Sequence, residues 1–252
     1  MNYSIIFYII GWILKLEAIF MFLPGITAVI YGETSGFAFL ITIIICLALG
    51  IPLTWKKPSK KAFYTKEGFV TVALSWIVLS IMGALPFIFS GSIPNPVDAI
   101  FETVSGFTTT GASILADVEI LPHCVLIWRS FTHWIGGMGV LVFILSLLPL
   151  TGGYHMNLMK AESPGPSVSK LVQHVKDTAK ILYGIYIAIT ICEATILRAL
   201  GMPLFDSLTT TFGTVGTGGF GIRNDSIAGY SPAIQITITV FMILSGINYT
   251  AY

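Results

Sequence analysis

The sequence predicts an all-α integral membrane protein that contains transmembrane helices and two related pore loops. Hydrophobic residues make up 55% of the 252 residues and charged residues only 10%, whereas a soluble domain carries about 25% charged residues. The loops are predicted from two uncharged stretches rich in Thr and Gly, Val104–Ser113 and Phe212–Gly221. Two such stretches between apolar segments indicate paired re-entrant loops that line an ion path.

The first two apolar segments predict two N-terminal transmembrane helices, which together occupy residues 1–55. A spanning helix needs about 20 mostly apolar residues. The first segment runs from about Tyr3 to Ile30, with a kink expected at Pro24-Gly25, and the second runs from about Gly36 to Trp55.

A basic loop at residues 56–67 predicts the orientation of the chain. Short loops rich in Lys and Arg stay in the cytoplasm, and this one carries five lysines, Lys56, Lys57, Lys60, Lys61 and Lys66. Since two helices precede the loop, the N-terminus is predicted to be cytoplasmic. The stretch from Gly91 to Pro122 has acidic residues but neither Lys nor Arg, which favours an outer location.

Residues 68–150 are predicted to form a first helix–pore-loop–helix repeat. It starts with a helix from about Gly68 to Ser90 and continues with a half-helix from about Pro96 to Ser105. The first Thr/Gly stretch follows, and then a helix from about His123 to Leu150. Residues 151–177 are polar and are predicted to be a cytoplasmic linker.

Residues 178–252 are predicted to form a second repeat of the same kind. Its elements are a helix to about Leu200, a half-helix from about Pro203 to Phe212, the second Thr/Gly stretch, and an apolar segment from about Ser231. A shift of 108 positions places Asp98 on Asp206, Thr109 on Thr217 and Gly111 on Gly219 without a gap. The last segment reaches only Tyr252, so we expect this repeat to be truncated.

The chemistry of the loops favours binding of a cation. Irregular backbone inside a membrane is tolerated only where it is buried in protein or lines a wet cavity, and inward carbonyl oxygens replace the water shell of K⁺ in channel filters. Glycine permits the backbone angles that such a loop needs, and the C-terminus of a half-helix carries partial negative charge. The predicted selectivity filter, with K⁺ as the bound metal ion, consists of Thr108, Thr109, Thr110, Gly111, Gly216, Thr217, Gly218 and Gly219.

Two alternatives remain open for these loops. Gly218 competes with Gly219 as the counterpart of Gly111 if the pairing slips by one residue, and ordinary extracellular turns would also be rich in Thr and Gly.

The sequence also gives expectations for three residues near the loops. Arg129 is expected to anchor its helix at the membrane interface, His133 to hydrogen-bond within the helix bundle, and Glu102 either to attract cations or to be solvated.

Other classes of function find no support in the sequence. The four histidines are scattered, so no transition-metal site is expected, and the three cysteines fit neither a metal site nor a disulfide framework. No serine-hydrolase or zinc-protease motif occurs, so the chain is not predicted to be an enzyme or to hold a covalent cofactor. A net charge of +1 gives no indication of nucleic-acid binding, and membrane lipid is the expected surrounding.

Several motifs together resemble the Trk/Ktr/HKT superfamily of potassium transporters, and most of all its bacterial TrkH branch. In chain order they are Ser105-Gly-Phe-Thr-Thr-Thr-Gly-Ala112, Thr132-His-Trp-Ile-Gly-Gly-Met-Gly139, Glu162-Ser-Pro-Gly-Pro166, Thr178-Ala-Lys180, Thr217-Gly-Gly-Phe220 and Met242-Ile-Leu-Ser-Gly-Ile-Asn-Tyr249. The resemblance extends over nearly the whole chain.

The resemblance implies potassium uptake across the bacterial inner membrane by a multi-pass protein. It implies four helix–pore-loop–helix repeats, of which this sequence has two, preceded by two extra transmembrane helices. It also implies a homodimer and a cytoplasmic nucleotide-binding regulatory subunit. A non-conducting half or truncated subunit that only assembles with other chains is the alternative. K⁺ over Na⁺ preference, coupling to H⁺ or Na⁺ as in a symporter, and the gating ligand are left open.

Overall fold

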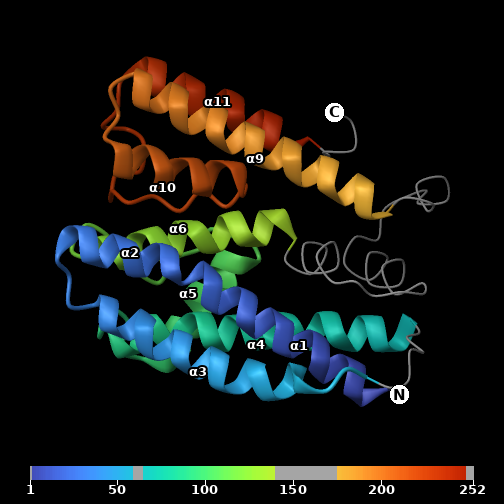
Figure 1. Cartoon of the computed structure of the whole chain (residues 1–252). Helices are drawn as coiled ribbons and strands as arrows, with labels where there is room; N and C mark the ends of the chain where they lie inside the picture. The colour runs from blue at the N-terminus through green and yellow to red at the C-terminus, as the bar shows by residue number, and fades with distance from the viewer. Residues whose placement is uncertain (1, 59–64, 140–174, 248–252) are drawn as a thin grey trace.

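The computed structural model describes residues 2–58, 65–139 and 175–247, and within these ranges the regular structure is helical throughout (Figure 1). Four helical stretches are long and apolar enough to cross a membrane, as the composition predicts. They are Tyr3–Tyr31, Gly36–Trp55, Lys66–Phe89 and Ile181–Ala199. The helices are α1 (Tyr3–Phe20), α2 (Phe22–Tyr31), α3 (Gly36–Trp55), α4 (Thr65–Phe89), α5 (Pro96–Phe107), α6 (His123–Met138), α9 (Val175–Ala199), α10 (Leu204–Val215) and α11 (Pro232–Gly246).

The first apolar segment is interrupted one turn earlier than the expected kink at Pro24-Gly25. Helix α1 ends at Phe20 and α2 begins at Phe22, with Met21 between them. A proline ring within a helix collides with the carbonyl group four residues before it, and for Pro24 that group belongs to Phe20. The proline therefore explains the break, although the break does not lie at the proline itself.

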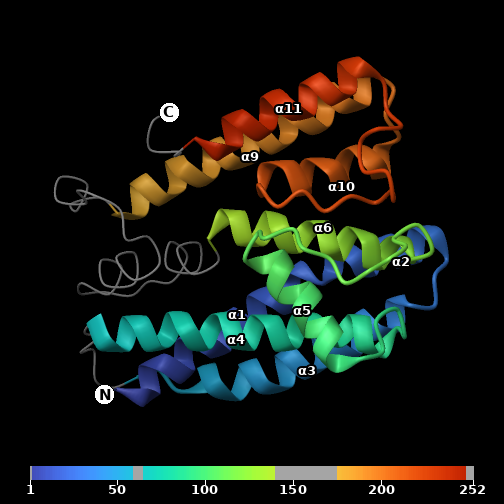
Figure 2. The same cartoon turned by 180° about the vertical axis from the view of Figure 1, so that it is seen from behind.

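Helices α1 and α3 pack closely where two glycines face each other. A Cβ atom added to Gly50 would lie 2.9 Å from the carbonyl oxygen of Gly11. Small residues at such crossings let helix backbones approach within a membrane. The pair α1–α3 forms one side of the molecule together with α4 (Figure 2).

The two predicted repeats have matching helices in the structure. Helices α5 and α10 each contain 12 residues, and a shift of 108 positions takes Pro96–Phe107 onto Leu204–Val215. The same shift takes α6 onto residues 231–246, where α11 runs from Pro232 to Gly246. Both half-helices extend two or three residues beyond the predicted ends at Ser105 and Phe212.

Helix α6 lies at the centre, between α5 on one side and α10 on the other (Figures 1 and 2). Twelve of its 16 residues are buried, so it packs against protein on most sides. The described part of the helix ends at Met138, followed by Gly139 in the left-handed conformation (φ 71°). The predicted continuation to Leu150 lies outside the described residues, as do most of the linker and residues 59–64 of the basic loop.

The N-terminus of α6 is capped by a residue from another part of the chain. The N-cap position is Pro122, whose side chain makes no capping hydrogen bond. Instead the carboxylate of Glu33, between α2 and α3, accepts hydrogen bonds from the backbone N–H groups of His123 (2.7 Å) and Cys124 (2.9 Å). Burial raises the pKa of Glu33, but these donors outweigh it and the pKa is lowered. Glu33 therefore fixes the position of the central helix relative to α2 and α3.

Candidate functional site

Residues 108–113 (the first loop) and 216–221 (the second loop) follow α5 and α10 and share an unusual backbone conformation. Thr109 and Thr217 have φ angles of 54° and 59°, and Gly111 and Gly219 have φ angles of 74° and 79°. A positive φ is uncommon for a residue other than glycine. Its occurrence at the same two positions of both loops indicates that both chains turn in the same way.

The backbone hydrogen bonds of the two loops also coincide. In the first loop the N–H groups of Thr108, Thr109 and Thr110 donate to the carbonyl oxygens of Val104, Gly106 and Ser105. In the second, the N–H groups of Gly216, Thr217 and Gly218 donate to the carbonyl oxygens of Phe212, Thr214 and Gly213. Each of these three donor–acceptor pairs is displaced by 108 positions, so Gly219, and not Gly218, is the counterpart of Gly111. The second loop has one further bond, from the N–H of Gly219 to the carbonyl oxygen of Gly213, without a counterpart in the first.

The carbonyl groups of the candidate filter residues accept no hydrogen bond within the described part of the chain. Among the described residues, none donates a hydrogen bond to the carbonyl oxygens of 108–111 or 216–219. Such groups need water, an ion or another chain, because an unpaired polar group in an apolar surrounding is unfavourable by several kcal/mol. Thr108, Thr110, Thr217 and Gly219 are also exposed, so one side of each loop is accessible.

The structure brings the two loops together. A Cβ atom added to Gly111 would collide with the carbonyl oxygen of Gly218, so the backbones of the two loops are in contact. Gly219, by contrast, has open space around the position of a Cβ atom. The two groups of predicted site residues therefore meet at Gly111 and Gly218.

Glycines allow α6 to lie directly against the ends of both half-helices. A Cβ atom on Gly136 would collide with the carbonyl oxygen of Phe107, at the end of α5. A Cβ atom on Gly216, just after α10, would collide with the carbonyl oxygen of His133. The half-helix ends are therefore held by a single helix between them.

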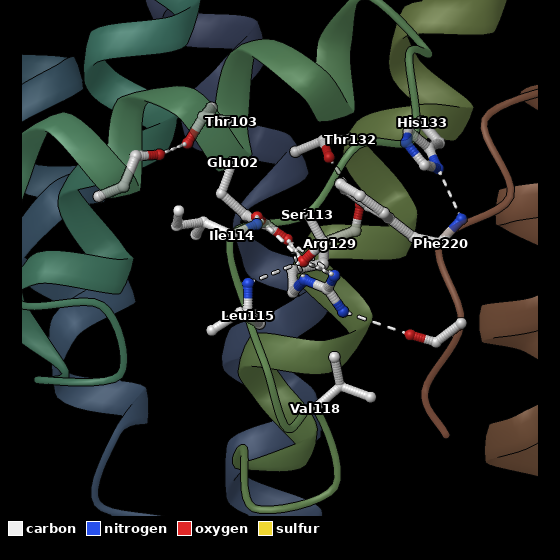
Figure 3. A network of polar contacts seen from close by, with 12 residues as sticks. Glu102, Thr103, Ser113, Ile114, Leu115, Val118, Arg129, Thr132, His133 and Phe220 are labelled. Atoms are coloured by element: carbon white, nitrogen blue, oxygen red, sulfur yellow. Dashed lines mark hydrogen bonds and ion pairs between the residues drawn. The ribbon is translucent and has the colours of Figure 1, made fainter. Parts of the chain in front are cut away.

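Glu102 and Arg129 form a buried ion pair behind the first loop, which corrects the expectations for both residues (Figure 3). Arg129 Nε donates to Glu102 Oε1 at 2.7 Å, and Nη2 lies 2.7 Å from the same oxygen. The side chains are only 2% and 0% exposed. Arg129 is thus no interface anchor, and Glu102 is neither solvated nor at an open mouth.

This ion pair holds the end of the first loop. Ser113 Oγ and the backbone N–H of Ile114 donate to the Glu102 carboxylate at 2.9 and 3.0 Å, and Arg129 Nη2 donates to Ser113 Oγ at 3.2 Å. The sequence contained one signal for the pair, since two opposite charges in neighbouring apolar helices are expected to face each other.

Arg129 and His133 reach across to the second loop as well (Figure 3). Arg129 Nη1 donates to the carbonyl oxygen of Gly221 at 3.3 Å, and the backbone N–H of Phe220 donates to His133 Nδ1 at 3.4 Å. His133 thus hydrogen-bonds within the bundle as predicted, and its partner is a loop.

After the second loop, Asn224 forms hydrogen bonds with residues 117–119, which follow the first loop. Its Nδ2 donates to Asp117 Oδ1 at 2.8 Å, its backbone N–H donates to Glu119 at 3.0 Å, and its Oδ1 accepts from the N–H of Val118 at 2.9 Å. The segments that follow the two loops are therefore hydrogen-bonded to each other.

A protein-family comparison identifies the class to which this arrangement belongs. The TrkH family, described as a cation transport protein, matches residues 35–252. The chain belongs to the TrkH family. Members of this family are transporters, so the chain is not an enzyme, as its motifs predict.

Individual relatives agree with this assignment. The chain is 41% identical to the Trk system potassium uptake protein TrkH of Salmonella typhimurium, over 99% of this chain and 52% of the relative. It is 32% identical to an uncharacterized cation transporter of Methanocaldococcus jannaschii, over 96% of this chain and 50% of the relative. It therefore spans about half the length of these curated relatives.

The fold agrees with a solved structure of the same family. The crystal structure of the potassium transporter TrkH from Vibrio parahaemolyticus superposes with a TM-score of 0.83 and 30% sequence identity. The match covers 99% of this chain and 51% of the crystallised one. The prediction of an all-α membrane protein is thereby confirmed.

Proposed function

We propose that this chain contributes part of a potassium path, lined by the carbonyl groups of residues 108–111 and 216–219. The observation that carries the proposal is the set of peptide oxygens that accept no hydrogen bond from the residues that the structure describes, on two loops with matching positive φ angles. Relatives named potassium uptake proteins support K⁺ as the transported ion. In this proposal residues 68–150 and 178–252 are successive repeats that each provide one loop.

Electrostatics around the loops favours a cation. Each half-helix ends where its loop begins, and the C-terminal end of a helix carries about −0.5 elementary charge. Arg129 does not oppose this, because Glu102 neutralises it at 2.7 Å. The membrane potential would supply about 2.3 kcal/mol per charge for each 100 mV.

The remaining parts of the proposal follow the family resemblance. They are an inner-membrane location with a cytoplasmic N-terminus, a homodimer, and a nucleotide-binding regulatory subunit on the cytoplasmic side. The basic residues Lys56, Lys57 and Lys66 support the orientation, since such loops stay inside.

Substitution of the two matched glycines tests the path. Gly111→Ser and Gly219→Ser are introduced into the full-length gene product and expressed in a host that lacks potassium transport. We expect each variant to reduce K⁺ over Na⁺ selectivity of uptake, because both positions have positive φ and a side chain would displace the carbonyl groups. Gly91→Ser is the matched control for Gly219→Ser, since Gly91 has φ 73°, likewise has open space around an added Cβ atom, and lies between α4 and α5, outside both loops.

Unchanged selectivity and rate in both loop variants would remove these glycines from the ion path. The second candidate function, a half that assembles but does not conduct, is favoured by the 52% coverage of the relative. Expression of residues 1–252 alone separates the two functions. Restored potassium uptake supports conduction by this chain, whereas membrane-inserted protein without uptake supports the need for a further chain.

A further inference from the structure

The ring of Phe220, directly after Gly219, is held between two side chains of α6 (Figure 3). On one side the guanidinium carbon of Arg129 lies 4.3 Å from the ring centroid. On the other, the ring of His133 is stacked at 4.0 Å between centroids. Arg129 and His133 are four residues apart, so they project from the same face of the helix. Phe220 is only 4% exposed.

The backbone around Phe220 is held by the same two side chains. His133 Nδ1 accepts from the N–H of Phe220 at 3.4 Å, and Arg129 Nη1 donates to the carbonyl oxygen of Gly221 at 3.3 Å. The carbonyl group of Gly219, one of the eight that accept no hydrogen bond from the described residues, therefore precedes a residue that is fixed by both its ring and its backbone.

The same guanidinium also holds the first loop, through Glu102 at 2.7 Å and Ser113 at 3.2 Å. One planar group thus contacts residues of both loops, Ser113 of the first and Gly221 of the second. The arrangement is not symmetric, because the residue 108 positions before Phe220 is Ala112, which has no ring to be held.

We propose that Phe220 is a specificity-determining positioning residue. Held between Arg129 and His133, it sets the level of the Gly219 carbonyl relative to Gly111 and thereby the discrimination between K⁺ and Na⁺. A binding constellation has to be held within about 0.5 Å of its productive geometry, and a loop with open space around Gly219 depends on such an anchor. This inference rests on the proposed potassium path.

The test is Phe220→Leu in the full-length gene product, with the ratio of K⁺ to Na⁺ affinity measured by competition against Rb⁺ uptake. We expect the ratio to fall about tenfold, which corresponds to about 1.4 kcal/mol, while the maximal rate changes less. The matched control is Phe212→Leu. Phe212, on α10, also packs against aromatic rings of α6, with centroid distances of 5.1 Å to Phe131 and 6.0 Å to Trp134, but it precedes the second loop. It should leave the ratio unchanged.

A second variant, Arg129→Lys, keeps the charge that faces Glu102 but removes the planar group that stacks on Phe220. We expect a smaller fall of the ratio in the same direction. If Phe220→Leu does not reach the membrane, this variant decides the question by the same criterion. An unchanged ratio in the inserted variants overturns the inference, and so does an equal fall in Phe212→Leu.

The glycine variants separate this inference from the proposed function. If Gly111→Ser and Gly219→Ser change selectivity but Phe220→Leu does not, only the role of Phe220 is refuted. If the glycine variants also leave selectivity unchanged, the ion path itself has been misplaced.

Discussion

Replacing Glu102 with glutamine removes the negative charge that faces Arg129 while leaving the volume of the side chain nearly unchanged. The two side chains are 0% and 2% exposed, and their nearest N and O atoms are 2.7 Å apart. The variant leaves a buried guanidinium without a counter-ion. Breaking a buried pair in this way destabilises proteins by about 3–5 kcal/mol.

The geometry of the pair gives a similar figure. At an effective dielectric constant near 20, unit charges at this separation attract each other by about 6 kcal/mol. The glutamine amide still accepts a hydrogen bond from Arg129, and a bond to a charged group contributes about 1.5–3 kcal/mol. The expected net loss is therefore about 3–4 kcal/mol.

A double-mutant cycle measures this loss. The free energy of unfolding is determined in mixed micelles by titration with dodecyl sulfate, for Glu102→Gln, Arg129→Gln and the double variant. We expect the double variant to be destabilised by about 3 kcal/mol less than the sum of the single variants, because neither charge is then left alone. Asp98→Asn, a charge removed from the first turn of the same half-helix, should lose only about 0.5 kcal/mol. Additivity within about 0.5 kcal/mol would refute the reasoning.

Two further predictions concern helix α6. Glu33→Gln should destabilise the protein by about 1–2 kcal/mol, because the cap of His123 is weakened. Since the pKa of Glu33 is lowered from 4.5 on folding, its contribution is complete above that pH and is lost as the pH falls through the folded value; an acid-unfolding curve that is the same in wild type and variant would contradict this. Gly136→Ala should destabilise by about 1–3 kcal/mol, because its Cβ collides with the carbonyl of Phe107. The measurement for Gly136→Ala is a thermal melt. In the same measurement Gly25→Ala should cause no loss of stability, because a Cβ atom added there meets nothing within 4 Å.

The elements that the sequence predicts well are those set by local pattern. The bounds of α3, Gly36–Trp55, agree with the prediction because an apolar run between polar turns defines them. The displacement by 108 positions is visible in the sequence because both loops require the same residues, glycine at Gly111 and Gly219, for the same positive φ. The break in the first apolar segment lies one turn before the predicted kink at Pro24-Gly25, because the steric effect of a proline acts on the preceding turn.

The contacts that hold the loops were missed because they join residues far apart in the chain. Glu102 and Arg129 are 27 residues apart, and His133 and Phe220 are 87 apart. Hydrophobic periodicity indicates which face of a helix is buried but not which polar groups meet there. The opposite charges of Glu102 and Arg129 were the available clue, whereas nothing in the sequence pairs His133 with Phe220.

The two loops match each other in sequence, but the side chains that hold them in place do not. The position that corresponds to Arg129 in the second repeat is Thr237, whose hydroxyl donates to Ala233 of its own helix at 2.8 Å. The position that corresponds to Glu102 is Thr210, which carries no charge. The second loop is therefore held by side chains of the first repeat. Substitutions of Arg129 and His133 on α6 should consequently affect the second loop as well as the first. Substitutions at the matching positions of α11, Thr237 and Phe241, should affect neither loop.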